Sequence, residues 1–396
     1  MFLLAHTALQ NYTNLKYRLS LGWTLLEVKV PKEAGKSLKG MEQVFAGLHG
    51  VYTQQVKWHH QLFKGKRLDW FSFEMVGIGG DTHFYIRTID KYRNLVESQV
   101  YAQYPEAEIT EAADYVNDMP LYLPDEKYDL WGAELLLNKE DVYPIRTYPA
   151  FEEKTGGKDD VKRIDPLASF SELFSTLHAG EQIWIQILAA PTGDEWIKKG
   201  QAVLDKLMGK APAPQKGNFL QDMVFSVDKA LTGIVPGPTV DAKDAKKPER
   251  PERPDLTPSP GKRDIMTAIE NSWDKLGYET GIRFLYIGPK DAFHQAHVAG
   301  ISGAFKQFSS MNLNGFKMNR HTLTFAKGLF KNSKLFMKKR AIYQTYRERR
   351  PMHQKYVLNT EEMATIFHFP DVGVRSPLLP RVEAKKGEPP VGLPIM

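Results

Sequence analysis

The pattern of apolar and polar residues over positions 21–125 predicts four strands and two helices. The strand segments are rich in β-branched and aromatic residues and end at glycine or proline, whereas the helical segments repeat apolar residues every three to four positions. The expected strands are residues 23–30, 70–76, 83–88 and 108–111, and the expected helices are residues 37–52 and about 90–104. The resulting order is β-α-β-β-α-β.

A second, looser round of the same pattern follows over positions 126–320. Two additional helices, residues 194–208 and 264–276, are expected between its second and third strands. Because β-α-β-β-α-β is the order of a ferredoxin-like unit, we predict an α+β fold of two tandem ferredoxin-like modules, residues 21–125 and 126–320. The expected strands of the second round are residues 130–137, 181–188, 281–287 and 314–318, and its expected helices are residues 165–177 and 292–308.

An insertion at positions 209–262 interrupts the second module. It is rich in proline, lysine, aspartate and glutamate, most densely at residues 246–254. Such a segment buries too little apolar surface to offset the entropy lost on ordering, and its prolines oppose regular structure. We therefore predict a disordered, mobile loop tip.

The two ends of the chain have patterns of their own. Residues 1–20 form an N-terminal segment that begins apolar but turns polar too soon to span a bilayer. Residues 357–396 predict a short helix, which Asn359 or Thr360 can cap and Pro370 ends, followed by an extended proline-rich C-terminal strap. The apolar residues expected to dock this helix on a partner are Met363, Ile366, Phe367 and Phe369.

The bulk composition narrows the class of protein. The chain has 396 residues, of which 42% are hydrophobic and 25% charged, and this length allows more than one core. It contains no cysteine, which excludes disulfides and thiolate metal sites and fits a reducing compartment. The net charge of +6 permits an acidic partner, but only the clustering of charge is informative at this length. We expect a cytoplasmic protein.

The strongest functional signal is a basic segment at positions 321–356, which we predict to be helical. Positions 327–350 hold nine basic residues and one acidic residue, and several of the lysines share one helical stripe. Nucleic-acid phosphates, anionic lipid headgroups or an acidic protein would fit this charge, and the alternative is a solvated helix without a partner. The candidate binding residues are Lys327, Lys331, Lys334, Lys338, Lys339, Arg340, Arg347, Arg349 and Arg350.

Patterns for catalysis, cofactors and metals are weak. His294 and His297 lie three positions apart on an expected helix, but a zinc site needs further ligands and the chain has no H-E-x-x-H pattern, so a helix surface with two partly exposed histidines is favoured. The glycines of residues 77–80 lie between two strands, which favours a hairpin turn over a phosphate loop. We therefore predict a non-catalytic protein with no cofactor and no metal.

Three segments resemble the non-catalytic N-terminal region of type IV secretion and conjugation ATPases, namely residues 93–105, 301–308 and 358–370. The resemblance extends over roughly residues 21–394. It implies a motor ATPase as the partner, and it implies a membrane-proximal N-terminus because such proteins often carry a transmembrane helix just before an equivalent of the segment at residues 12–14. The motor's phosphate loop, G-x-x-x-x-G-K-[ST], does not occur in this chain, and residues 155–158 are the nearest approach. Nucleotide hydrolysis is therefore not implied.

Two hypotheses follow from the sequence. The first is a non-catalytic scaffold or accessory subunit of a type IV secretion or conjugative DNA-transfer machine. It would dock a motor ATPase, or a copy of itself, at the cytoplasmic face of the membrane, and its basic helix would contact DNA or lipid. The second is a stand-alone nucleic-acid-binding module centred on the basic helix at residues 327–350.

Overall fold

The structure is a computed structural model that describes most of the chain between Tyr12 and Pro370. The disordered insertion expected at 209–262 falls largely, and the C-terminal strap beyond Pro370 entirely, outside the described residues, as do residues 155–158. In 152–154 and 161–163 only the backbone is described. The described residues are 12–13, 16–17, 19–30, 38–52, 68–154, 161–208, 259–352 and 354–370.

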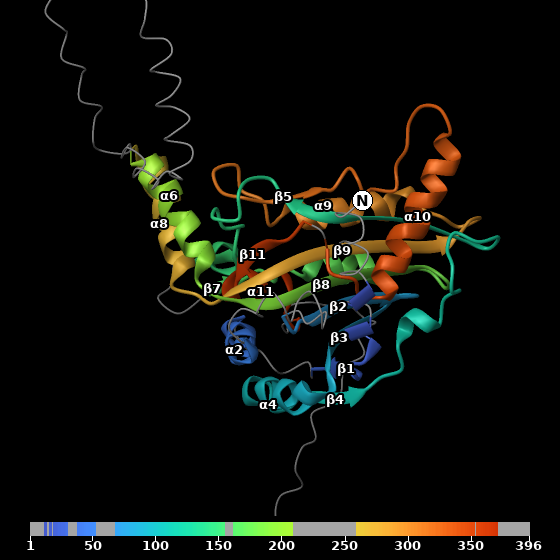
Figure 1. The fold of residues 1–396 in the computed structure, drawn as a ribbon, viewed down its shortest axis with the longest axis horizontal. Coiled ribbons are helices and arrows are strands. Elements are labelled where there is room, and N and C mark those ends of the chain that lie inside the picture. The colour runs from blue at the N-terminus through green and yellow to red at the C-terminus, as the bar shows by residue number, and fades with distance from the viewer. Residues whose placement is uncertain are drawn as a thin grey trace, which may run out of the picture.

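One antiparallel sheet runs through the described fold, in the order β10-β5-β9-β8-β2-β3-β1-β4, with β11 pairing with β9. Figure 1 shows the sheet descending from β5 to β4. A separate hairpin joins β6 and β7. The strands are β1 (Trp23–Lys29), β2 (Phe71–Ile78), β3 (Asp81–Ile89), β4 (Glu108–Glu111), β5 (Tyr128–Leu137), β6 (Glu152–Lys154), β7 (Val161–Arg163), β8 (Gln182–Thr192), β9 (Gly277–Pro289), β10 (Phe316–Met318) and β11 (Tyr356–Asn359).

The two halves of the sheet have the same strand order. In the first half, β1 and β3 are central and β2 and β4 flank them; in the second half, β5 and β9 are central and β8 and β10 flank them. The halves meet where β2 pairs with β8, in a register that runs from Phe71 opposite Ala189 to Ile78 opposite Gln182. This pairing joins the two rounds of the sequence pattern into one continuous sheet.

Helices from both halves cover one face of the sheet and share its main core. Strand alternation explains this, because Phe71, Phe73 and Met75 of β2 face these helices while Glu74 points to the opposite face. The core-face helices are α2 (Lys39–Leu48), α4 (Arg93–Gln103), α5 (Ala168–Ser175), α9 (Gln295–Lys306) and α11 (Thr360–Ile366). The short 3-10 turns are η1 (His49–Val51), η2 (Asp90–Tyr92), η3 (Tyr115–Asn117) and η4 (Tyr148–Phe151).

The opposite face carries a second, smaller core under one long helix, α10 (Lys331–Arg347). Its buried Tyr343 and Tyr346 pack against Trp184 of β8, with ring centroids 6.1 and 5.3 Å apart. The segment around η3 fills the space beside them, where Tyr115 lies 5.2 Å from the same tryptophan ring. α10 is therefore held over the junction between the two halves.

The connection between the second and third strands differs between the halves. In the first half, Gly79 and Gly80 make a tight turn at φ angles of 56° and 104°, which glycine adopts without strain. This agrees with the hairpin predicted at residues 77–80. In the second half, α6 (Glu195–Leu207) and α8 (Pro260–Trp273) pack together as a helical arm that projects from the sheet (Figure 1).

The expected α+β composition is confirmed, because each strand and helix predicted for positions 21–320 is present with bounds shifted by a few residues. Sequence reasoning missed the β6–β7 hairpin and β11. No helix in the described ranges combines the length and the apolar character that crossing a bilayer requires.

The helix expected to dock on a partner lies inside this fold. Asn359 caps α11 as expected, and it forms a capping box with Glu362 in which each side chain accepts the other's backbone N–H at 2.9 Å. The rings of Phe367 and Phe73 lie 5.2 Å apart in the first half of the core. The four predicted docking residues are at most 5% exposed: Met363, Ile366, Phe367 and Phe369.

α11 also binds the second half of the molecule. The Glu362 carboxylate accepts the backbone N–H of Ile145 at 2.8 Å, and the Thr365 hydroxyl accepts that of Tyr148 at 3.0 Å. These contacts and the packing of Phe367 link the two halves on the helical face. The docking prediction for α11 is therefore corrected: its apolar spacing is that of a core helix, which local sequence does not distinguish from a helix that docks on another chain.

Candidate functional site

The basic segment singled out in the sequence splits into two parts in the structure. The C-terminal part of α10 and the residues after it, which we call the root, lie against the sheet. The N-terminal part of α10 and the loop before it, residues 325–337, stand above the sheet in Figure 1, and we call them the tip. The helix predicted over 321–356 is shorter, because α10 begins at Lys331 and ends at Arg347. Lys327 therefore lies in the loop before the helix, and only Lys331, Lys334 and Lys338 of the predicted stripe are helical.

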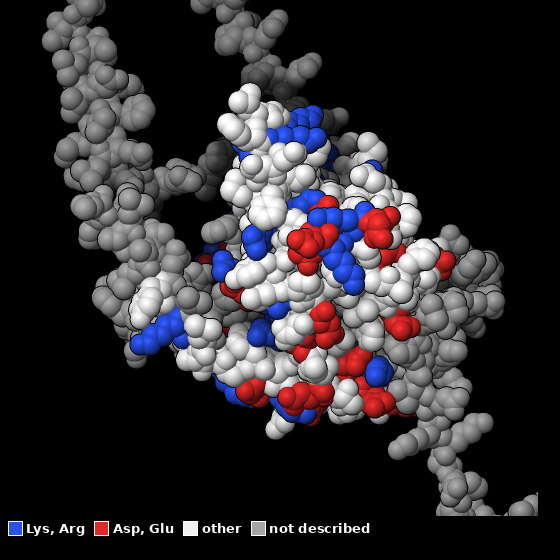
Figure 2. Space-filling model, turned by 90° about the vertical axis from the view of Figure 1, so that its right-hand side faces the viewer, with Lys and Arg blue, Asp and Glu red and all other residues white. Residues whose placement is uncertain are grey.

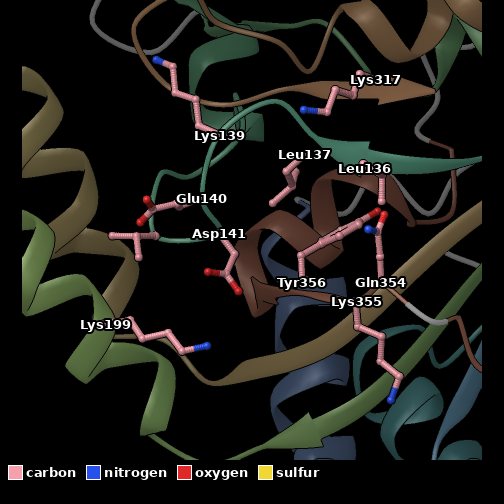
Figure 3. A pocket seen from close by; sticks show the side chains of 11 residues that line it. Leu136, Leu137, Lys139, Glu140, Asp141, Lys199, Lys317, Gln354, Lys355 and Tyr356 are labelled. Atoms are coloured by element: carbon pink, nitrogen blue, oxygen red, sulfur yellow. The ribbon is translucent and has the colours of Figure 1, made fainter. Parts of the chain in front are cut away.

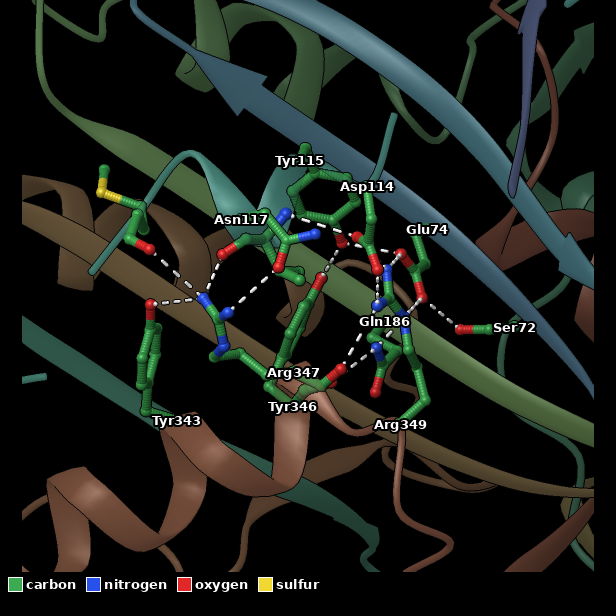
Figure 4. A network of polar contacts seen from close by, with 12 residues as sticks. Ser72, Glu74, Asp114, Tyr115, Asn117, Gln186, Tyr343, Tyr346, Arg347 and Arg349 are labelled. Atoms are coloured by element: carbon green, nitrogen blue, oxygen red, sulfur yellow. Dashed lines mark hydrogen bonds and ion pairs between the residues drawn. The ribbon is translucent and has the colours of Figure 1, made fainter. Parts of the chain in front are cut away.

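Arg349 is the centre of the root and is 1% exposed. Its guanidinium binds the Glu74 carboxylate through two hydrogen bonds of 2.9 and 3.0 Å, and it binds Asp114 through bonds of 2.6 and 2.9 Å (Figure 4). The two acids come from β2 and from the segment before η3. A planar guanidinium matches carboxylates in this two-bond manner, and the fully engaged Arg349 has no donor left for a phosphate.

Glu74 is fully buried and accepts several further hydrogen bonds. Ser72 donates at 2.5 Å, Gln186 of β8 at 3.0 Å and the Tyr115 hydroxyl at 2.7 Å. Burial acts to raise the pKa of Glu74. The positive charge of Arg349 and the hydrogen bonds donated by Arg349, Ser72 and Tyr115 outweigh burial and lower the pKa to about 2. Glu74 is therefore ionised at neutral pH and forms a closed ion pair across the junction.

Arg283 is a second buried arginine at the root, and sequence reasoning missed it. It lies on β9 and donates to the backbone carbonyls of Thr345 and Arg350, the first at 2.5 Å. These carbonyls lie at the C-terminal end of α10, where the helix dipole favours a cation. An arginine inside an otherwise apolar strand is the signal in the sequence that could have revealed this anchor.

The remaining basic residues of the root also have partners inside the chain. The Lys338 ammonium donates to three backbone carbonyls of residues 320–325 at 3.0 to 3.2 Å, and Lys339 pairs with Asp129 at 2.6 Å. Arg340 stacks over the Tyr122 ring at 4.6 Å. Arg347 donates to backbone carbonyls around η3, and Arg350 pairs with Glu348.

The tip retains three exposed lysines, Lys327, Lys331 and Lys334. Lys327 lies 5.5 Å from the Phe325 ring, and the described residues provide no side-chain partner for Lys331 or Lys334. Figure 2 shows lysine or arginine among uncharged residues at the upper end of this face, and aspartate and glutamate only from the middle downward. Of the nine predicted binding residues, these three are the exposed ones at the tip, and Arg350 at the root is exposed but pairs with Glu348.

A cleft of about 460 Å³ lies between β5, β10, β11 and α6 (Figure 3). The Lys139 ammonium donates to the carbonyl of Asn312 at 2.8 Å and Lys355 pairs with Glu279, so these two point away from the centre of the cleft. Lys199 of α6 points inward, near Asp141. The cleft has mixed charge and presents no convergent acid–base pair.

The histidine pair noted in the sequence belongs to a second polar cluster. His297 is 7% exposed and lies 3.5 Å from the buried Glu181 carboxylate, which also accepts the Tyr286 hydroxyl at 2.5 Å. Burial lowers the pKa of His297 despite this carboxylate. His294 is exposed, so the expected pair of partly exposed histidines is corrected for His297. No group of three or more metal-ligating residues forms within the described ranges.

The fold and these sites define an α+β protein with one long antiparallel sheet and a rooted basic helix. A model of the family described as "Domain of unknown function (DUF8128)" matches residues 5–377. The match spans most of the chain, so the protein belongs to this family. No curated protein matches the sequence.

Proposed function

We propose that the chain is a non-catalytic docking scaffold built from two ferredoxin-like modules. It would serve a type IV secretion or conjugative DNA-transfer machine as an accessory subunit, binding a motor ATPase at the cytoplasmic face of the membrane. The observation that carries the proposal is the repeated strand order, in which the first and third strands of each half are central and the second and fourth flank them. That order is the one expected of β-α-β-β-α-β units of this kind.

The connections within the sheet support a binding role over a catalytic one. The two halves are fused through β2 and β8, through α11 and through the Glu74–Arg349 pair, so the two sets of surfaces are held in a fixed relation. A rigid body with large helical and loop surfaces suits the positioning of partners. Among the described residues, the Arg349 guanidinium is engaged by Glu74 and Asp114, and these contacts hold α10 on the sheet.

The edges of the sheet favour a different chain as the partner over a second copy. The edge strands β4 and β10 have only four and three residues, and β4 begins and ends with the exposed Glu108 and Glu111. Short, charged edge strands oppose edge-to-edge pairing. A docked ATPase would therefore contact helices and loops.

Co-purification from the native host tests the proposal. The chain is tagged at its own locus, cross-linked in cells and recovered, and the partners are quantified by mass spectrometry. We expect a secretion or conjugation ATPase in near-stoichiometric amount, and a tagged unrelated cytoplasmic protein of similar size serves as the control. Recovery without such an ATPase, in a host that expresses one, would reject the scaffold role.

The nucleic-acid-binding alternative has one specific observation in its favour, namely the three exposed lysines of the tip. It predicts binding whose affinity falls with salt at a log–log slope of about −2 to −3, since each neutralised phosphate contributes roughly −0.7 to −0.9. Fluorescence anisotropy with single- and double-stranded oligonucleotides measures this slope. A slope near −8 would require the buried root arginines to engage phosphates and would contradict the arrangement described above.

A further inference from the structure

The tip combines exposed apolar side chains with exposed lysines. Its lysines, Lys327, Lys331 and Lys334, alternate in the sequence with the apolar residues. A group of neighbouring apolar side chains that are exposed to solvent and flanked by charges of one sign is typical of an interaction surface. The apolar side chains and their exposed fractions are Leu329 78%, Phe330 73%, Met337 61%, Phe325 53% and Phe336 43%.

Contacts at the base of the tip fix its position relative to the sheet. Below it, the Lys338 ammonium ties the carbonyl of Phe325 to the helix, and the Lys339–Asp129 pair fixes the next position. Burial of α10 begins only at Ile342. The first turns of α10 and the preceding loop therefore project as a supported feature beyond the sheet (Figure 1).

The charge around the tip has one sign. No aspartate or glutamate occurs between Asp291 and Glu348 in the sequence. Asp129, the acid that pairs with Lys339, lies below the tip at the root. The upper end of the face in Figure 2 shows lysine or arginine and uncharged residues. The electrostatic complement of this surface is an anionic one.

The composition of the apolar group selects among anionic partners. Leu329 and Met337 are flexible aliphatic side chains with no capacity to stack on bases, and Leu329 is the most exposed of the five apolar side chains of the tip. Apolar residues flanked by lysine are the arrangement that enters the headgroup boundary of a bilayer, where burial of apolar area and attraction to anionic lipid act together.

We propose that the tip is a membrane-contact element that inserts Leu329 and Phe330, with Met337 and Phe336 behind them, into the headgroup region of an anionic bilayer. Lys327, Lys331 and Lys334 would lie against the lipid phosphates. This deepens the proposed function and depends on it only for the identity of the membrane, which would be the cytoplasmic leaflet at the secretion or conjugation machine. The contact is peripheral, through one end of a helix.

Vesicle sedimentation with the full chain tests the tip. The probes are vesicles of about one-third phosphatidylglycerol in phosphatidylcholine, compared with pure phosphatidylcholine. We expect binding to the anionic vesicles only. Changing Lys327, Lys331 and Lys334 together to glutamine should weaken this binding roughly a hundredfold, because each lysine contributes about fivefold near an anionic surface. The pair Leu329→Ser and Phe330→Ser should weaken it by about tenfold or more.

Matched controls separate the tip from bulk charge. The exposed Lys198, Lys206 and Lys262 of the helical arm, changed together to glutamine, remove the same charge elsewhere and should leave vesicle binding unchanged. Tyr101→Ser on α4 is the apolar control, since this ring is also exposed. Circular dichroism and thermal unfolding of each variant verify the fold.

Three outcomes would overturn the proposal. These are equal binding to both vesicle types, full binding by the serine pair, and binding of oligonucleotides with none to vesicles, which would assign the tip to nucleic acid. The test is independent of the scaffold experiment. Vesicle binding without ATPase recovery would reject the scaffold role and support membrane contact by the tip. ATPase recovery without vesicle binding would support the scaffold role and reject membrane contact by the tip.

Discussion

The root and the tip of α10 are adjacent in sequence and both basic, yet they have opposite environments. At the root, Arg349 is buried in a two-carboxylate cage. At the tip, Lys331 and Lys334 are exposed beside apolar side chains that are also exposed. A run of basic residues is therefore not by itself a binding surface, because some of its side chains can form ion pairs and hydrogen bonds within the fold.

The largest expected effect comes from opening the root. Arg349→Leu should lower the free energy of unfolding by about 3–5 kcal/mol, because it leaves the buried Glu74 carboxylate without its counter-charge. Urea denaturation followed by circular dichroism measures this change. Arg350→Leu is the matched control and should cost less than about 0.5 kcal/mol, since its pair with Glu348 is exposed. A loss of similar size in both variants would place the stabilisation outside the Glu74–Arg349 pair.

The second effect is the pH dependence of the root. Because the pKa of Glu74 is lowered in the folded state from 4.5 to about 2, its contribution is fully present above about pH 4.5 and is lost as the pH falls toward 2. A shift of this size corresponds to a contribution of about 3 kcal/mol.

Unfolding free energies measured between pH 2 and 5 test this, by comparison with the double variant Glu74→Met and Arg349→Met. The double variant keeps the volume of the site without its charges, so its acid-induced loss should be smaller by that amount. Parallel pH curves for the two proteins would show that Glu74 is not the group that titrates.

A smaller effect is expected where root and tip meet. Lys339→Met should cost about 0.2–1 kcal/mol, since the pair with Asp129 is only half-buried and is screened by solvent and salt. The effect should shrink at high salt and should not add to that of Asp129→Asn, which removes the same interaction. Additive losses in the two single variants would indicate separate roles for these side chains.

The smallest stability effect is expected at the tip. Phe330 has a φ angle of 57° in the left-handed region, which disfavours an aromatic residue. Phe330→Asn should leave the stability unchanged or raise it by up to about 1 kcal/mol, because asparagine enters this region at lower cost. Thermal unfolding measures this, with Leu329→Asn as a control at a neighbouring exposed position. A clear loss of stability in Phe330→Asn would show that the ring packs within the fold.

The alternation of apolar and polar residues determined much of the fold. It placed the strands and helices of both halves because periods of two and of three to four are imposed by the backbone itself. The sequence offered Asn359 or Thr360 as the cap of this helix, and the structure has Asn359 in a capping box. β11 was missed because its four residues, Tyr356–Asn359, were assigned in part to the start of the helix.

The sequence identified the candidate binding segment, but it could not separate the buried cations of that segment from the exposed ones. Charge density identified residues 327–350, and helical spacing indicated a stripe of lysines. The carboxylates that bind Arg349, Glu74 and Asp114, lie more than 200 positions away in the chain. No local pattern reports such a partner, so the prediction treated buried and exposed cations alike.

By itself, the sequence determined the order of the elements, the repetition of that order and the position of the basic helix, since these depend on local periodicity and charge. Only the tertiary structure decided that the halves share one sheet through β2 and β8, that α11 links them from inside, and that α10 is bound at one end and exposed at the other. These features depend on contacts between residues far apart in the chain. A charged side chain can be buried there only if the fold brings a partner of opposite charge to it.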